Sequence, residues 1–267
     1  MSARNGSPQP QNTLAALDYQ GQPVGVRPEN LSLRDLAYRR LKEDIVLGRL
    51  AFAAVLSPRK LASEMGMSSL PVGEALRILE AEGLVESRDR VGTRVKVPTV
   101  EHIEGVYTLR EALESQAARL CCVRASRQQR RLLNSMARQV DDMYARCARD
   151  DASDDLWHET TIFHANFHRF ITECAGCPML TAAIENSQVL IFKILFDSTL
   201  RRKKRPRDWH RSLVAAILEG DPAAADAAAR GHIHYGIAEV LCCVRALQPG
   251  NRWRGRPRQG RRPASLV

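Results

Sequence analysis

The sequence predicts a mainly helical protein: a winged helix-turn-helix with a small β-hairpin wing, followed by an all-helical bundle. Two observations predict this fold class. Residues 33–97 contain, in order, a helix, a helix-turn-helix and two short β-prone runs. From residue 99 onward every strong periodic pattern is helical. The chain therefore divides into a flexible N-terminal arm (1–30), a winged helix-turn-helix domain (31–98), a helical domain (99–247) and a basic disordered tail (248–267).

Each element of the first domain has a local start or stop signal. Three serines precede apolar residues at helical spacing and are expected to cap the three helices: Ser32, Ser57 and Ser68. Three glycines are expected to end them: Gly48, Gly66 and Gly83. The β-prone runs 84–88 and 93–97 then flank a turn over residues 89–92, which predicts a two-stranded wing.

In the second domain, glycines and prolines separate six predicted helices. We expect them over residues 100–123, 127–149, 154–173, 178–199, 208–219 and 221–245. No strand-like alternation accompanies them, so a helical bundle is predicted.

Composition narrows the function without deciding it. The net charge is +10, but six arginines lie in the tail after residue 248, so charge alone does not establish nucleic-acid binding. That tail is read either as a solvated appendage or as a non-specific DNA clamp. Seven cysteines without a small-scaffold spacing suit a reducing compartment, and no stretch of about 18 apolar residues occurs. We expect a cytoplasmic protein with no membrane partner.

The helix-turn-helix supplies candidate DNA contacts. The second helix of such a motif enters the major groove with its N-terminal end, and a wing contacts phosphates or the minor groove. The predicted DNA-binding residues are Arg59, Ser68, Ser69, Arg88, Arg90, Gly92 and Arg94. For any single basic residue here, a solvated surface position is the alternative.

The run Gly66–Val85, continued by Arg88–Val95, resembles the signature of the GntR family of bacterial regulators. The resemblance covers residues 33–97 and implies a homodimer that binds a double-stranded DNA operator. Two departures stand out. Ser69 and Gly73 occupy positions where the family usually has arginines, and the Pro-Gly that usually precedes the second helix is missing, with Ala53-Ala54 nearby. The resemblance therefore does not predict the usual operator half-site.

Four histidines form a possible metal site. His164 and His168 are four residues apart and therefore share one helical face, while His210 and His232 lie in the last two predicted helices. Imidazoles from three helices can converge on one ion in a bundle. A histidine pair at this spacing more often faces solvent or makes a core hydrogen bond, and that alternative stays open.

Residues 104–245 resemble the FCD-type effector domain found in a large GntR subgroup. The resemblance rests on Phe167-His168, His210 followed by Ile217 and Asp221, and His232-Ile233. It implies a divalent metal that anchors a small carboxylate effector. His164 stands where the family commonly has Asp, and an all-nitrogen ligand set favours zinc or nickel over manganese or magnesium. Arg110 matches a family arginine and is the candidate effector contact; a salt bridge with Glu114 is its alternative.

The sequence thus predicts a DNA-binding transcription regulator, not an enzyme, whose operator affinity changes when an organic acid binds at the metal. Two other functions remain. A metal-dependent hydrolase is disfavoured because no His-Glu-x-x-His motif is present. A regulator that responds to the metal itself is the third possibility. The lone Cys174–Cys177 pair lacks the context of a redox or zinc motif.

Overall fold

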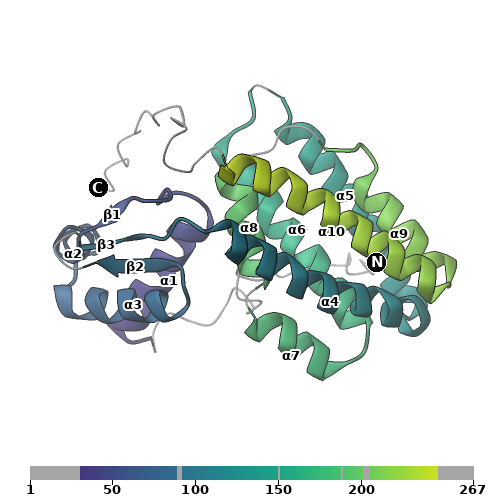
Figure 1. Cartoon of the computed structure of the whole chain (residues 1–267), viewed down its shortest axis with the longest axis horizontal. Helices are drawn as coiled ribbons and strands as arrows, with labels where there is room; N and C mark the ends of the chain where they lie inside the picture. The colour runs from purple at the N-terminus through teal and green to yellow at the C-terminus, as the bar shows by residue number, and fades with distance from the viewer. Residues whose placement is uncertain (1–30, 89–91, 150, 188, 201–204, 246–267) are drawn as a thin grey trace, which may run out of the picture.

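The computed structural model describes residues 31–88, 92–149, 151–187, 189–200 and 205–245. The predicted N-terminal arm, the basic tail and the tip of the wing, including Arg90, lie outside these residues. Figure 1 shows two lobes: helices and a small sheet form the left one, and helices form the right one.

The first lobe begins with three short helices whose ends match the local signals in the sequence. They are α1 (Leu33–Val46), α2 (Pro58–Met65) and α3 (Ser69–Ala81). The side chains of Ser32 and Ser57 accept hydrogen bonds from backbone N–H groups in the first turns of α1 and α2. Gly66 ends α2 in the left-handed conformation, which allows the sharp turn into α3.

A three-stranded antiparallel sheet completes this lobe. Its strands are β1 (Val55–Leu56), β2 (Val85–Arg88) and β3 (Gly92–Val95), in the order β1-β3-β2. The predicted hairpin is β2 and β3, with Glu86 opposite Arg94. The strand β1 was not predicted, because two residues are too few to show a period and their pairing with β3 is long-range.

In the residues that the structure describes, every regular element of the second lobe is a helix. They are α4 (Val100–Arg124), α5 (Arg127–Cys147), α6 (Asp154–Cys174), α7 (Pro178–Asn186), α8 (Val189–Leu200), α9 (Trp209–Glu219) and α10 (Pro222–Arg245). Side chains of Thr99, Ser126 and Ser153 cap α4, α5 and α6. In Figure 1, α4 and α10 run side by side along the lobe. The winged helix-turn-helix and the helical bundle of the sequence prediction are confirmed.

One predicted helix is wrong in extent. The single helix expected over residues 178–199 is two helices, α7 and α8. The apolar pattern continues through the break, and neither Gly nor Pro marks it, so the sequence carried no stop signal. At the end of α7 the Ser187 hydroxyl donates to the Ile184 carbonyl, a local bond of the kind that competes with helix continuation.

The two lobes share buried apolar surface. At the C-terminal end of α1, Val46 and Leu47 pack with Ala165 of α6 and with Ile191 and Ile194 of α8, and all five are buried. The first lobe therefore rests directly on the bundle through the end of α1. Among the helices that the structure describes, none is long and apolar enough to cross a membrane.

Candidate DNA-reading surface and metal centre

Of the seven predicted DNA contacts, six lie in residues that the structure describes, and five of these are exposed. Arg59, Ser68, Ser69, Arg88 and Gly92 are exposed. In contrast, the Arg94 side chain is only a quarter exposed, and its Nε lies 2.6 Å from Oε1 of Glu86 on the neighbouring strand. Arg94 is thus held on the sheet by an acid, while Arg90 lies outside the described residues.

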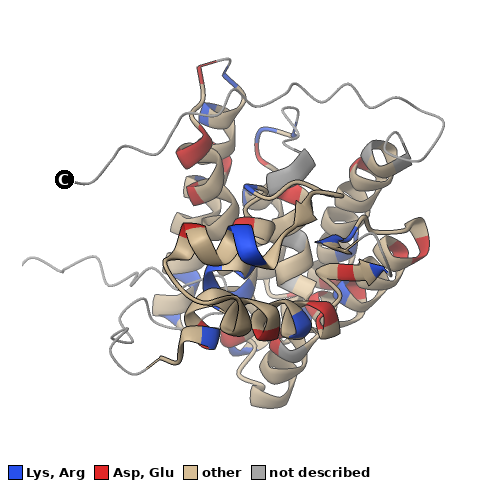
Figure 2. Cartoon of the chain, turned by 90° about the vertical axis from the view of Figure 1, so that its left-hand side faces the viewer, with Lys and Arg blue, Asp and Glu red and all other residues tan. Residues whose placement is uncertain are grey.

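The start of α3, the helix predicted to enter the major groove, has a largely exposed surface. Ser68 is the N-cap residue but makes no side-chain capping bond, so its hydroxyl is available to a ligand. Leu70, in the first turn, is 71% exposed. A Cβ placed on Gly73 would meet no atom within 4 Å, so packing does not require a glycine there. Figure 2 views this end of the molecule and shows basic and acidic residues interspersed on it.

Four histidines converge inside the second lobe. His164 and His168 come from α6, His210 from the first turn of α9 and His232 from the middle of α10. All four are buried, and one nitrogen from each lies within 4.8 Å of the others. Nε2 of His164 is 3.1 Å from Nε2 of His168 and 2.7 Å from Nε2 of His210. The four residues predicted from the sequence are therefore brought together.

Buried carboxylates hold two of these rings from behind. Nδ1 of His168 lies 2.8 Å from Oε2 of Glu114 on α4. Nδ1 of His210 lies 2.6 Å from Oδ1 of Asp141 on α5, and Asp141 also accepts the His210 backbone N–H. A carboxylate at Nδ1 keeps the proton on that nitrogen, so the Nε2 lone pair faces the centre. The rings are thus oriented as metal ligands are.

His232 is held differently. Neither of its ring nitrogens has a hydrogen-bond partner among the described residues, although the residue is only 5% exposed. Its ring stacks on Trp209, with centroids 4.0 Å apart and planes at 21°. Burial, reinforced by His210 and His168, lowers the pKa of His232 well below its usual value, so the ring is neutral. A buried imidazole without a partner is costly, and a metal ion would satisfy it.

The chemistry of the donors fits a borderline divalent ion. Four imidazole nitrogens suit zinc or nickel better than manganese or magnesium, which prefer oxygen ligands. The remaining histidines that the structure describes, His102, His158 and His234, lie outside this group, as does the Cys174–Cys177 pair.

Arg110 forms a buried ion pair with Glu114, which was the predicted alternative to an effector contact. Its Nε lies 2.7 Å from Oε1 of Glu114, and the two side chains are 4% and 7% exposed. Although burial opposes ionisation, Arg110 and His168 together hold the pKa of Glu114 well below its usual range. Arg110 thus reaches the histidine group through Glu114.

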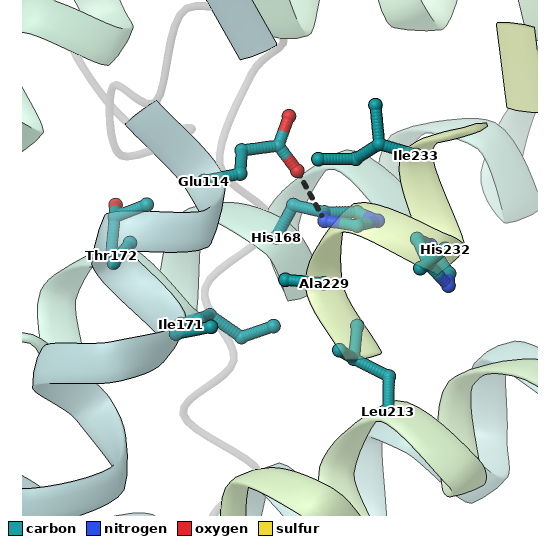
Figure 3. A pocket seen from close by; sticks show the side chains of 10 residues that line it. Glu114, His168, Ile171, Thr172, Leu213, Ala229, His232 and Ile233 are labelled. Carbon is teal, nitrogen blue, oxygen red and sulfur yellow. Dashed lines mark ion pairs between the residues drawn. The ribbon is translucent and has the colours of Figure 1, made fainter. Parts of the chain in front are cut away.

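Two spaces of different size adjoin the histidines. A cavity of about 10 Å³ lies beside His168 and His232, with Glu114, Ile171 and Leu213 in its wall (Figure 3). On the side of His210, a hollow of about 870 Å³ is lined by Asp141, Tyr144, Arg205 and Arg211, among others. The first holds no more than about one water molecule. The second is large enough for a small organic molecule.

Sequence reasoning identified the four histidines but not the groups that orient them. Arg110–Glu114 could be found, because residues four apart in a helix are neighbours. Asp141 and Trp209 carry no comparable signal, because Asp141 is 69 residues from the histidine that it contacts. Only the fold brings them together.

Both lobes match known protein families. Residues 33–95 match the family described as "Bacterial regulatory proteins, gntR family", and residues 105–235 match the FCD domain. Among curated proteins, the chain is 28% identical over 196 residues to a "Probable D-xylose utilization operon transcriptional repressor" of Paenarthrobacter nicotinovorans, covering 71% of this chain and 80% of that one. It is 25% identical over 217 residues to the HTH-type transcriptional repressor RspR of Escherichia coli K12, covering 80% and 90%.

Two solved structures share the fold. They are E. coli McbR/YncC, with a TM-score of 0.61 and 21% identity over 80% of this chain and 99% of that one, and a GntR transcriptional regulator from Rhodococcus sp. RHA1, with a TM-score of 0.62 and 19% identity over 79% and 99%. The chain belongs to the GntR family, with an FCD domain after its helix-turn-helix, and is a DNA-binding transcriptional regulator rather than an enzyme.

Proposed function

We propose that this regulator binds one divalent metal ion, zinc or nickel, through His164, His168, His210 and His232, and that the state of this site sets its affinity for an operator. The observation that carries the proposal is the convergence of four buried imidazole nitrogens, one of them on a ring without any hydrogen-bond partner among the described residues. In this scheme residues 31–98 bind DNA, and residues 99–247 bind the ligand and form the dimer.

For the DNA end, we propose that the exposed start of α3 enters the major groove. Ser68 and Ser69 approach the bases, Arg59 anchors the backbone, and the wing residues Arg88, Arg90 and Gly92 contact phosphate or the minor groove. Arg94 joins them by exchanging Glu86 for a phosphate. A homodimer on a two-fold operator, acting as a repressor as the names of two relatives state for those proteins, completes the proposal.

The first candidate for the signal is a small carboxylate. Five buried charged side chains surround the histidines, two of them basic (Arg110, Arg205) and three acidic (Glu114, Asp141, Asp197). A divalent ion added to this set leaves one net positive charge, which a monocarboxylate neutralises. The hollow beside His210 supports this candidate, because Arg205 and Arg211 line it and it has room for such a molecule.

The second candidate is the metal itself. Four imidazoles already complete a tetrahedral set, and the cavity beside His168 and His232 has space for about one water. A regulator whose four histidines close around zinc or nickel would sense the ion without any organic ligand.

Packing between the lobes offers a route from either ligand to DNA. Ala165 follows His164 directly in α6 and packs in the cluster that contains Val46 and Leu47 at the end of α1. Tightening of the histidine group on an ion therefore acts on the helix that underlies α3. Such coupling between two sites is typically worth about 1–3 kcal/mol.

The test compares His232→Ala with His234→Ala in the full-length protein. His234 lies on the same helix but is exposed and outside the histidine group, so it is the matched control. Zinc and nickel affinity is measured by competition with a chromophoric chelator. Operator affinity is measured by fluorescence anisotropy, on a duplex selected from a random library by the wild-type protein.

We expect one ion per chain in the wild type and in His234→Ala, and a loss of binding of at least about tenfold in His232→Ala. Operator affinity should change on chelation in the first two proteins and not in the third. If acetate, succinate or citrate shifts operator affinity only when metal is present, the carboxylate is the signal; if metal alone does so, the ion is. A wild-type protein that binds neither ion would refute the site.

A further inference from the structure

The four proposed ligands do not have equivalent surroundings. His168 and His210 each place Nδ1 directly against a carboxylate, at 2.8 and 2.6 Å. His164 instead has a tyrosine hydroxyl at that position: Oη of Tyr144 lies 2.7 Å from its Nδ1. The nearest carboxylate oxygen, Oδ2 of Asp197, is 3.3 Å away.

The contacts of Tyr144 and Asp197 continue beyond His164. The Tyr144 hydroxyl donates to Oδ2 of Asp197 at 3.4 Å, and Oδ1 of Asp197 accepts from Nη2 of Arg205 at 3.0 Å. The guanidinium of Arg205 also lies over the Tyr144 ring, 3.8 Å from its centroid. The side chains of His164, Asp197 and Arg205 are each no more than 5% exposed, so water does not screen these charges.

One assignment of the protons orients His164 toward the centre. In it the Tyr144 hydroxyl donates to Asp197 and accepts from His164, so that His164 carries its proton on Nδ1. Its Nε2 then presents a lone pair at 3.1 Å from His168 and 2.7 Å from His210, where the group converges. Asp197 lies outside the converging group itself and is therefore placed as an outer partner and not as a ligand.

We propose that Asp197, acting through Tyr144, is the positioning residue that fixes His164 as a metal ligand and supplies negative charge behind a ligand set that has none. The inference rests on the proposed metal site. Carboxylates behind ligand histidines typically change metal affinity by about 10–100-fold. Here the effect is enhanced by Arg205, since removal of the Asp197 charge leaves an uncompensated guanidinium beside the histidines.

The first measurement is zinc affinity, by chelator competition in the full-length protein. We expect Asp197→Asn to weaken binding by about 10–100-fold. Asp142→Asn, which removes a carboxylate that is 70% exposed on α5, should leave affinity within about twofold. Adding Arg205→Met to Asp197→Asn should recover part of the loss, because the unpaired cation is gone. Tyr144→Phe should show an intermediate loss.

The second measurement does not need a metal. In protein labelled with ¹⁵N-histidine, long-range ¹H–¹⁵N NMR correlations report which ring nitrogen carries the proton. We expect the Nδ1–H form for His164 in the metal-free wild type, and a mixture of both forms in Tyr144→Phe and Asp197→Asn. A purely structural role for Asp197 would leave this signature unchanged in any variant that folds.

The outcomes separate this inference from the proposed function. A wild type that binds no metal refutes the metal site, and the tautomer measurement then still decides whether Tyr144 and Asp197 fix the ring. A wild type that binds zinc, with equal affinity in Asp197→Asn and an unchanged His164 tautomer, refutes the inference alone. If Asp197→Asn does not fold, Tyr144→Phe carries both measurements.

Discussion

Replacing Arg110 by alanine should cost the protein much of its stability. The Arg110 guanidinium and the Glu114 carboxylate are 2.7 Å apart and at most 7% exposed, and Glu114 also pairs with His168. Truncation of Arg110 leaves the carboxylate buried without its cation. Breaking a buried pair in this way typically costs about 3–5 kcal/mol.

That loss is large compared with the total free energy of unfolding. Folded proteins are typically stable by about 5–15 kcal/mol, so Arg110→Ala would remove roughly a fifth or more. For a urea m-value of about 3 kcal/mol/M, the midpoint of unfolding should fall by about 1–1.7 M. The assay is urea unfolding of metal-free protein followed by circular dichroism, so that ligand binding does not contribute.

Two comparisons make the result interpretable. Arg40→Ala removes an exposed partner of Asp44 at the same i,i+4 spacing and should cost no more than about 0.5–1 kcal/mol. The double variant Arg110→Met with Glu114→Gln should lose less than the sum of its single variants, by about 0.5–3 kcal/mol. A midpoint shift no larger than that of Arg40→Ala would refute the reasoning. Arg110 would then contribute little to stability, and an effector contact would again be its predicted role.

Three further predictions concern the first lobe and its link to the second. Gly73→Arg should fold normally, since space is open at that position. It should add a preference for guanine in the bound DNA worth about 1–3 kcal/mol. Selection from random duplexes measures this preference, and an unchanged preference would contradict the prediction. Ala53 has φ of 64°, so Ala53→Gly should raise the free energy of unfolding by about 0.5–1 kcal/mol in a urea titration, whereas destabilisation would show that the turn is unstrained. Ile194→Ala should lower the free energy of unfolding by about 2–5 kcal/mol. It should also bring the ratio of operator affinities with and without zinc toward one. An unaltered ratio would exclude this contact from the coupling between the metal site and the DNA-binding lobe.

Local signals explain how much of the fold was predictable. Serine caps and glycine stops act within a few residues, so the helices of the first lobe and most helices of the second could be placed from sequence. The break between α7 and α8 has no glycine or proline, and β1 is two residues long, so both depended on tertiary structure. The left-handed conformation of Ala53 carried no signal in the sequence, because alanine rarely adopts it.

Part of the candidate metal site could also be predicted from sequence. Spacing along one helix put His164 and His168 together, and the family resemblance added His210 and His232. The groups behind them could not be found. Asp197 is 53 residues from Tyr144 in the chain, and only the packing of α8 against α6 brings that carboxylate to His164.

The most direct test of the metal centre is X-ray absorption spectroscopy at the metal edge, on protein loaded with one equivalent of zinc. We predict a ligand sphere of four nitrogens at about 2.0–2.1 Å, with the multiple-scattering pattern of imidazole. Because the chain also has seven cysteines, the measurement distinguishes histidine nitrogen ligands from the cysteine sulfur ligands that could replace them. Sulfur ligands at about 2.3 Å, or fewer than three imidazoles, would contradict a site formed by the four histidines.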